Sequence, residues 1–233
     1  MREPLILLPG LLNDARLWRH QIAQLADLTE ILVADLVGPD TIVGMAERVL
    51  GMQAGRFALA GLSMGGYVAF EVMRRAPEQV LRLALLDTSA RADTPDQTAR
   101  RRGLIELAQK GRFLGVTPRL LPQLLHPDHA RNHAIANTVV QMARSVGREG
   151  FMAQQRAIMG RPDSRPDLGR IGCPTLVLGG REDAVTPPEV LMEIAAGIPR
   201  ARLALIEHCG HLSPLEQPVA VTTAMAEWLT APG

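Results

Sequence analysis

Residues 57–66 read FALAGLSMGG, a short apolar run that ends in a Gly-x-Ser-x-Gly sequence, and a helix-like apolar segment follows over residues 67–75. A strand that turns sharply into a helix is the setting in which Ser63 would be presented as a nucleophile on a strained turn. The neighbours two positions away must then be small, and Gly61 and Gly65 meet that need. The stretch predicts a nucleophile turn at the end of a buried strand.

Short apolar runs alternate with amphipathic segments on both sides of this turn, which is typical of a parallel sheet covered by helices on both faces. The predicted strands are residues 5–8, 31–34, 57–60, 80–86, 175–178 and 203–206. The predicted helices cover residues 18–25, 41–52, 67–75, 188–196 and 218–229. We therefore predict the α/β class, with about six parallel strands.

Residues 91–165 interrupt this alternation, because they contain no strand-like apolar run. Helical stretches are predicted at residues 99–108, 118–125, 130–145 and 150–159. We interpret this segment as a helical lid inserted after the fourth strand, on a single core formed by residues 1–90 and 166–233.

The predicted lid also concentrates positive charge. Residues 91–165 contain 13 basic side chains against six acidic ones. One hypothesis is that the lid attracts substrates with a carboxylate or phosphate group, such as acyl-CoA thioesters or half-esters of dicarboxylic acids. The alternative is that these arginines occupy the solvated faces of the lid helices.

The composition of the whole chain argues against several classes of partner. Its 233 residues carry 25 basic and 24 acidic side chains, so neither nucleic acid nor an anionic membrane is expected to bind. The apolar residues 5–12 are broken at Pro9-Gly10 and lack a signal-peptide cleavage site, so we expect a cytoplasmic protein. Cys173 and Cys209 match neither a disulfide framework nor a zinc site, and no metal or cofactor is expected. The sequence makes no prediction of oligomeric state.

A serine hydroxyl is a weak nucleophile at neutral pH, so Ser63 needs a base and an acid that orients the base. In this architecture the chain order is serine, acid, histidine. Asp183 follows the strand at residues 175–178 and is the predicted acid, and His211 follows the last strand and is the predicted base. Both lie after carboxyl ends of parallel strands, where open α/β sheets place their ligand crevice.

Three further residues compete for these two roles. Glu182 and Asp87 are alternative acids, although Asp87 beside Thr88 and Ser89 is more simply a turn or capping carboxylate. His208 is the alternative base, but it is predicted inside or at the end of the last strand, too early for a loop that folds back over the serine. A structural role is the favoured interpretation of His208.

An attacked carbonyl develops an oxyanion that needs preorganised donors, commonly two backbone N–H groups. The residue after the nucleophile, Met64, supplies one of them. The loop after the first strand supplies the other, where Pro9-Gly10 lets the backbone turn and presents the N–H of Leu11. Leu12 is the second choice, and Pro9 has no N–H to donate.

Together these residues resemble the α/β-hydrolase superfamily, in its lid-bearing form, and are similar in layout to the pimeloyl-ester esterases and related small carboxylesterases. The resemblance spans nearly the whole chain. It departs from the family at Pro9, where many relatives have histidine, and in lacking the usual amino-terminal strand pair. The parts that carry it are Leu8-Pro9-Gly10-Leu11-Leu12, Gly61-Leu62-Ser63-Met64-Gly65-Gly66, Gly180-Arg181-Glu182-Asp183, Thr186-Pro187, Gly210-His211 and Glu216-x-Pro218.

The resemblance implies a serine hydrolase that cleaves a small-molecule carboxylic ester or thioester through an acyl-serine intermediate. Ser63 would be the nucleophile, Asp183 the acid and His211 the base, with Leu11 and Met64 as the oxyanion hole. The same residues would serve a C–C bond hydrolase, an acyltransferase, a lyase or a perhydrolase, so these alternatives stay open. A receptor that binds a small ligand without turnover, with the lid as a switch, is a further alternative.

Overall fold

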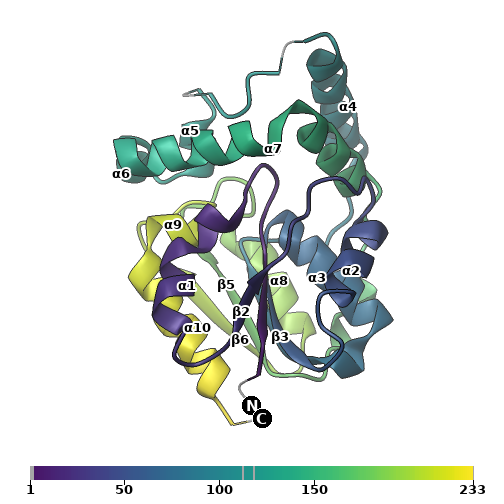
Figure 1. Cartoon of the computed structure of the whole chain (residues 1–233), viewed down its shortest axis with the longest axis vertical. Coiled ribbons are helices and arrows are strands. Elements are labelled where there is room, and N and C mark those ends of the chain that lie inside the picture. The colour runs from purple at the N-terminus through teal and green to yellow at the C-terminus, as the bar shows by residue number, and fades with distance from the viewer. Residues whose placement is uncertain (1–2, 112, 118, 233) are drawn as a thin grey trace.

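The computed structural model describes residues 3–111, 113–117 and 119–232 (Figure 1). In these residues six strands form one sheet in the order β2-β1-β3-β4-β5-β6, and every neighbouring pair is parallel. The predicted six-stranded parallel sheet is therefore confirmed. The strands are β1 (Leu5–Leu8), β2 (Ile31–Val33), β3 (Phe57–Leu62), β4 (Val80–Leu86), β5 (Thr175–Gly180) and β6 (Ala201–Ile206).

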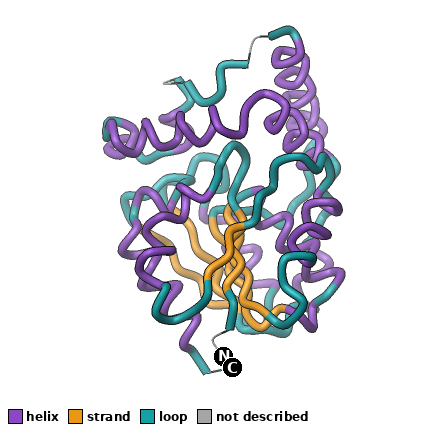
Figure 2. The backbone as a smooth tube through the Cα atoms, viewed as in Figure 1, coloured by secondary structure: helices purple, strands orange, loops and turns teal. Residues whose placement is uncertain are grey.

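The central strands are continuous apolar runs because both faces of the sheet are covered. Successive side chains of β1 enter opposite cores: Leu5 and Leu7 pack in one cluster, and Ile6 and Leu8 in the other. All four side chains are fully buried. Figure 2 shows the strands between two layers of helices.

Helices α1 and α10 cover one face of the sheet, and α2, α3 and α8 cover the other. Their bounds are α1 (Arg19–Leu25), α2 (Ile42–Leu50), α3 (Met64–Arg75), α8 (Pro188–Gly197) and α10 (Pro218–Thr230), with the short helix α9 (Ser213–Glu216) before α10. Three 3-10 helices, η1 (Ala15–Trp18), η2 (Pro77–Gln79) and η3 (Arg165–Arg170), complete the core. No helix in the described ranges has both the length and the hydropathy that crossing a membrane requires.

Among the described residues, four α-helices lie between β4 and β5 in the chain and above the carboxyl ends of the strands (Figure 1). We call residues 91–165 the inserted segment. Its helices are α4 (Pro95–Gln109), α5 (Leu121–Leu124), α6 (Pro127–Ala130) and α7 (His133–Met159).

Three helix predictions in the inserted segment are wrong in their bounds. The stretches 130–145 and 150–159 form one element, α7, because Gly147 takes a φ of +70° and the helix resumes after this kink. Of the predicted helix 118–125 only residues 121–124 are helical, and Pro118 lies outside the described residues. Helix α4 begins earlier than predicted because Thr94 and Gln97 form a capping box.

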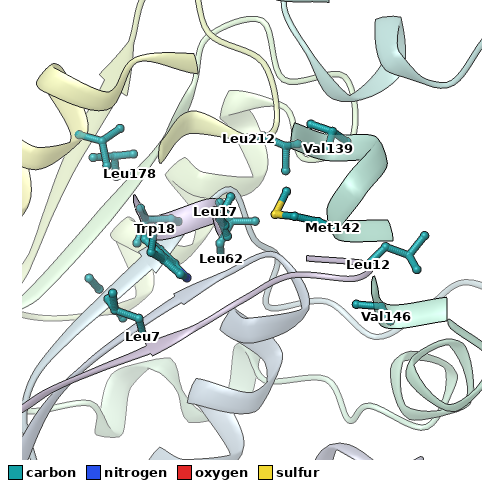
Figure 3. Close-up of a cluster of buried hydrophobic side chains, with 14 of the residues drawn as sticks. Leu7, Leu12, Leu17, Trp18, Leu62, Val139, Met142, Val146, Leu178 and Leu212 are labelled. Atoms are coloured by element: carbon teal, nitrogen blue, oxygen red, sulfur yellow. The ribbon is translucent and has the colours of Figure 1, made fainter. Parts of the chain in front are cut away.

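The inserted segment packs on the core through α7. Val139, Met142 and Val146 are buried on one stripe of this helix and belong to the same apolar cluster as Leu12 and Leu212. In Figure 3 Val139 lies beside Leu212, Val146 lies near Leu12, and Met142 lies between them. This packing places the inserted segment directly over the strand ends from which the predicted site residues project.

Candidate active site

Ser63 lies between β3 and α3 in a strained turn. Its φ of 53° and ψ of −113° belong to a region that non-glycine residues rarely adopt. Its neighbours are necessarily glycines: a Cβ on Gly61 would lie 2.4 Å from the Gly65 carbonyl oxygen, and one on Gly65 would lie 2.3 Å from the Leu8 carbonyl oxygen. The predicted turn thus forms because the sequence leaves room for the helix to approach the strands closely.

The structure brings together the three residues predicted from the three strand ends. His211 Nε2 lies 3.0 Å from Ser63 Oγ, and His211 Nδ1 lies 2.8 Å from Asp183 Oδ2. His211 and Asp183 are buried, with 4% and 3% of their surface exposed. A hydroxyl, an imidazole and a carboxylate therefore form one continuous hydrogen-bonded line.

The Asp183 carboxylate is held by several donors besides His211. Its Oδ1 accepts hydrogen bonds from the Val185 N–H at 2.7 Å and the Thr186 N–H at 3.0 Å, and Oδ2 accepts one from the Thr186 hydroxyl. Burial by itself raises the pKa of Asp183, but the positive charge and hydrogen bond of His211 and the donors of Thr186 outweigh it, and the net pKa is lowered. Asp183 is thus an ionised partner for the imidazole.

The imidazole of His211 has a pKa above its ordinary value of 6.5. Burial lowers this pKa, whereas the charge and hydrogen bond of Asp183 raise it, and the carboxyls of Asp87 and Glu216 add to the rise. The net effect stabilises the protonated form, so His211 is a stronger base than a free imidazole.

Asp87 has a different role from Asp183. It directly follows β4, with a φ of 44°, and is fully buried. Its Oδ1 accepts a hydrogen bond from the Gly180 N–H at 2.9 Å and its Oδ2 interacts with the Ser213 hydroxyl, and no hydrogen bond joins it to His211 in the described part of the chain. Burial, with the negative charge of Asp183 nearby, raises the pKa of Asp87 well above its ordinary value.

The other two competing residues also lie outside the hydrogen-bonded line. The Glu182 carboxylate accepts a hydrogen bond from the Cys209 N–H at 2.9 Å. His208 is exposed two residues beyond the end of β6, and its ring meets the edge of His126 with centroids 5.6 Å apart. Its predicted place inside or at the end of the strand is wrong, because β6 stops at Ile206 and the chain turns at His208 with a φ of 52°.

One backbone N–H in the loop after β1 has no hydrogen-bond partner among the described residues. Leu12 has a φ of 60°, and its N–H donates to Gln154 Oε1 at 3.0 Å, so this group is already used. The N–H of Leu11 makes no hydrogen bond to any described residue, and Leu11 lines the same cavity as Ser63. Met64 begins α3, and the first N–H groups of a helix have no partner within it.

Sequence reasoning missed Gln154 and Gln155, a buried polar pair on α7. Gln154 fixes the Leu12 N–H, and Gln155 Oε1 accepts a hydrogen bond from Arg101 Nη1 at 2.7 Å. The only signal in the sequence is that these two polar residues interrupt a helical stretch whose other residues are mostly apolar. Their partners come from distant parts of the chain, which no local spacing reveals.

A cavity of about 670 Å³ lies between the inserted segment and the site. Ser63 and His211 line it, and Arg101 and Arg119 are the charged arginines among its described lining residues. Its apolar wall is formed by Leu11, Leu12, Leu104, Leu107, Ala108, Phe113, Leu114, Val116, Leu120, Leu124, Val139, Phe151, Ile158, Val185 and Leu212. Such a space, mostly aliphatic with few polar groups, suits a small ligand with an apolar portion. Within the described ranges no group of three or more His, Cys, Asp and Glu side chains is arranged to hold a metal ion.

Known proteins share this sequence pattern and architecture. The chain matches the family described as alpha/beta hydrolase fold over residues 50–218. It is 27% identical to a pimeloyl-[acyl-carrier protein] methyl ester esterase of Nitrosomonas europaea, over 92% of this chain and 90% of that protein. The solved structure of a thermophilic esterase from Thermogutta terrifontis has a TM-score of 0.89 and 35% identity, with coverage of 97% and 89% of the two chains. An enol-lactonase from Burkholderia xenovorans has a TM-score of 0.90 and 25% identity, with coverage of 99% and 92%. The chain therefore belongs to the α/β-hydrolase fold family and is a hydrolase.

Proposed function

We propose that this hydrolase cleaves a carboxylic ester or thioester through an acyl-serine intermediate. The observation that carries the proposal is the hydrogen-bonded line from Ser63 Oγ through His211 to Asp183 Oδ2, with distances of 3.0 and 2.8 Å. A serine on a strained turn with a buried base and an ionised acid has the parts that acyl transfer needs. Two similar proteins, one a methyl ester esterase and one an enol-lactonase, are named for reactions at ester carbonyls.

The reaction proceeds in two halves. Ser63 Oγ attacks the carbonyl carbon while His211 Nε2 takes the hydroxyl proton, and the charge of Asp183 stabilises the imidazolium. The carbonyl oxygen becomes an oxyanion; when it collapses back to a carbonyl, the alcohol or thiol leaves with the proton from His211. Water then attacks the acyl-serine, again losing a proton to His211. The acid is released and Ser63 regains its hydrogen.

The N–H groups of Leu11 and Met64 would bind the oxyanion. The Leu12 N–H is held by Gln154, which leaves Leu11 as the donor from the loop after β1. Removal of one such donor lowers turnover by roughly 10²–10³-fold in enzymes of this kind. Gln154 therefore supports the oxyanion hole indirectly, because it fixes the backbone beside Leu11.

Residues 91–165 would serve as a lid on a core formed by residues 1–90 and 166–233. The cavity beneath them is mostly aliphatic, which suits the acyl or alcohol chain of a small-molecule ester. Arg101 and Arg119 in its wall favour an ester that also carries a carboxylate.

This function is tested by measuring turnover of methyl esters and thioesters of increasing acyl length. Ser63→Ala should lower turnover by roughly 10⁶-fold and leave the fold intact. Ser145→Ala is the matched control, because Ser145 is exposed on α7 and belongs to no part of the site. Ester turnover that survives in Ser63→Ala would refute the acyl-serine mechanism.

A further inference from the structure

The loop that carries His211 is held at three consecutive backbone N–H groups. The Gly210 N–H donates to Glu216 Oε2 at 3.1 Å, and the Leu212 N–H donates to Glu216 Oε1 at 3.0 Å. The N–H of His211 itself donates to the Leu124 carbonyl oxygen at 2.9 Å. The Glu216 carboxylate therefore binds the backbone on both sides of His211, and the inserted segment binds the backbone of His211 itself.

The same carboxylate also binds the inserted segment. Glu216 Oε2 accepts a hydrogen bond from the His126 N–H at 2.7 Å and lies 3.1 Å from His129 Nδ1. The Glu216 side chain has 0% of its surface exposed. Its partners are three backbone N–H groups and one imidazole nitrogen, and they include no arginine or lysine among the described residues.

The backbones of the two segments are in direct contact at Gly210. A Cβ at this position would lie 2.7 Å from the His126 nitrogen and 2.8 Å from the Leu125 carbonyl carbon. Only glycine leaves room for residues 124–126 to lie against the loop that carries His211. The contact therefore depends on close packing as well as on the hydrogen bonds of Glu216.

We infer that Glu216 is a positioning residue that fixes the loop of the catalytic base and fastens residues 124–129 of the inserted segment to it. This inference rests on the proposed function, in which His211 is the base. Glu216 touches neither Ser63 nor the cavity; it acts through the backbone on both sides of His211. We call the contacts of Glu216 with Gly210, Leu212, His126 and His129 the clamp. A displacement of about 1 Å in a catalytic group lowers turnover by up to about 10²-fold, so loss of the clamp should slow the chemical step.

The carboxylate also adds to the charge around the base. The carboxyls of Asp183, Asp87 and Glu216 all raise the pKa of His211 against the effect of burial. On the side of the inserted segment, His126 and His129 face Glu216. Removing the charge of Glu216 should therefore move the acid limb of the pH–rate profile to lower pH.

The variant that tests this is Glu216→Gln, which keeps the shape and removes the charge. Its amide offers one acceptor oxygen where four donors converge, so part of the clamp is lost. Turnover is measured per site labelled to completion by a fluorophosphonate, which separates misfolding from a defect in chemistry. We expect kcat per labelled site to fall by about 10-fold to 100-fold, KM to change little and the acid limb to move to lower pH.

Two further variants separate the clamp from general stability. Glu216→Asp keeps the charge but shortens the reach, so kcat per labelled site should fall while the acid limb stays in place. Glu71→Gln is the matched control, since Glu71 is a buried carboxylate whose partners are Arg74 and Arg75 on α3. It should lower thermal stability without altering kcat per labelled site or the pH profile.

The outcomes distinguish this inference from the function on which it rests. A wild-type protein that takes up no label would overturn both. A labelled wild type beside Glu216→Gln with unchanged kcat per site and an unchanged acid limb would overturn the clamp alone. If Glu216→Gln does not fold, an unchanged kcat per site in Glu216→Asp overturns it in the same way.

Discussion

Asp87 and Asp183 are two buried carboxyls whose pKa values are shifted in opposite directions. Burial raises the pKa of Asp87, while the charge and hydrogen bond of His211 and the donors of Thr186 together outweigh burial and lower that of Asp183. The difference follows from the partners: Asp183 bonds to the imidazole, whereas Asp87 bonds to Gly180 and Ser213. In the proposed mechanism, the environment of each carboxyl, rather than its residue type, assigns the role of acid to Asp183.

Replacing each carboxyl by its amide tests this assignment. Asp183→Asn should lower kcat by roughly 10³–10⁴-fold, because the imidazole loses its ionised partner and its tautomer is no longer fixed. Asp87→Asn should change kcat little, since an amide can accept from the Gly180 N–H and donate to the Ser213 hydroxyl. Steady-state kinetics on one ester substrate provides the comparison, and a larger loss in Asp87→Asn would assign the acid to Asp87.

In the proposed mechanism, the raised pKa of His211 sets the acid limb of activity. The base must be neutral to accept a proton, so kcat/KM should fall as the pH drops through a pKa above 6.5. In Asp183→Asn the negative charge that most strongly raises this pKa is gone, so the limb should move to lower pH in the residual activity. A limb that stays in place would mean that another group controls it. Rates measured from about pH 5 to about pH 9 at constant ionic strength give the answer.

The turn between β3 and α3 requires glycine at Gly61, because a side chain there would collide with the backbone. Gly61→Ala puts a Cβ against the backbone of Gly65, which a side-chain rotation cannot relieve. A Cβ added at Gly103 in α4 would meet no atom within 4 Å beyond its own stretch of helix, so Gly103→Ala is the matched control. We expect Gly61→Ala to lower the melting temperature and abolish turnover, and Gly103→Ala to stabilise the protein by about 0.5–1 kcal/mol. Equal melting temperatures in thermal denaturation would contradict this description of the turn.

The strands could be predicted because their cause is local. A strand buried on both faces, such as β1 or β3, is a continuous apolar run, and its end marks where a site residue follows. Helix limits in the inserted segment were harder, because Gly147 resembles a helix break although it only kinks α7. A glycine between two helical stretches is compatible with both outcomes, and packing against the core decides between them.

The site was predictable only where its residues follow strand ends. Ser63, Asp183 and His211 were predicted in this way, and their side chains lie within hydrogen-bond distance of one another along one line. The bond of Gln154 to Leu12 joins residues 142 positions apart, so nothing in the local sequence encodes it. The same is true of Glu216, which the sequence marked only through family resemblance and whose contacts reach across 90 positions to His126.

At the scale of the whole molecule, part of the positive charge of the inserted segment is neutralised by ion pairs, and part of it lines the cavity. Asp93 pairs with both Arg101 and Arg161, so these three groups keep one net positive charge. Arg101 lines the cavity, and its Nη1 is held by Gln155. The basic segment therefore presents an ordered guanidinium at the cavity as well as solvated arginines outside it.

Substrate charge should accordingly matter through Arg101. Arg101→Met should raise KM for a half-ester of a dicarboxylic acid by about tenfold, because one charge-assisted hydrogen bond is lost. KM for the neutral methyl ester of equal length should not change. Arg100→Met is the control, because Arg100 is the exposed neighbour outside the cavity wall. Equal, salt-independent kcat/KM for the two esters in wild type would rule out selection by charge.

The central claim, that Ser63 is an activated nucleophile, is tested most directly by intact-protein mass after exposure to a fluorophosphonate, followed by peptide mapping. Ser63 and His211 line a common cavity with a separation of 3.0 Å between Oγ and Nε2. We predict one adduct per chain, located on Ser63 and absent from Ser63→Ala. A folded protein that acquires no adduct, or one that is modified at another serine, would contradict the claim.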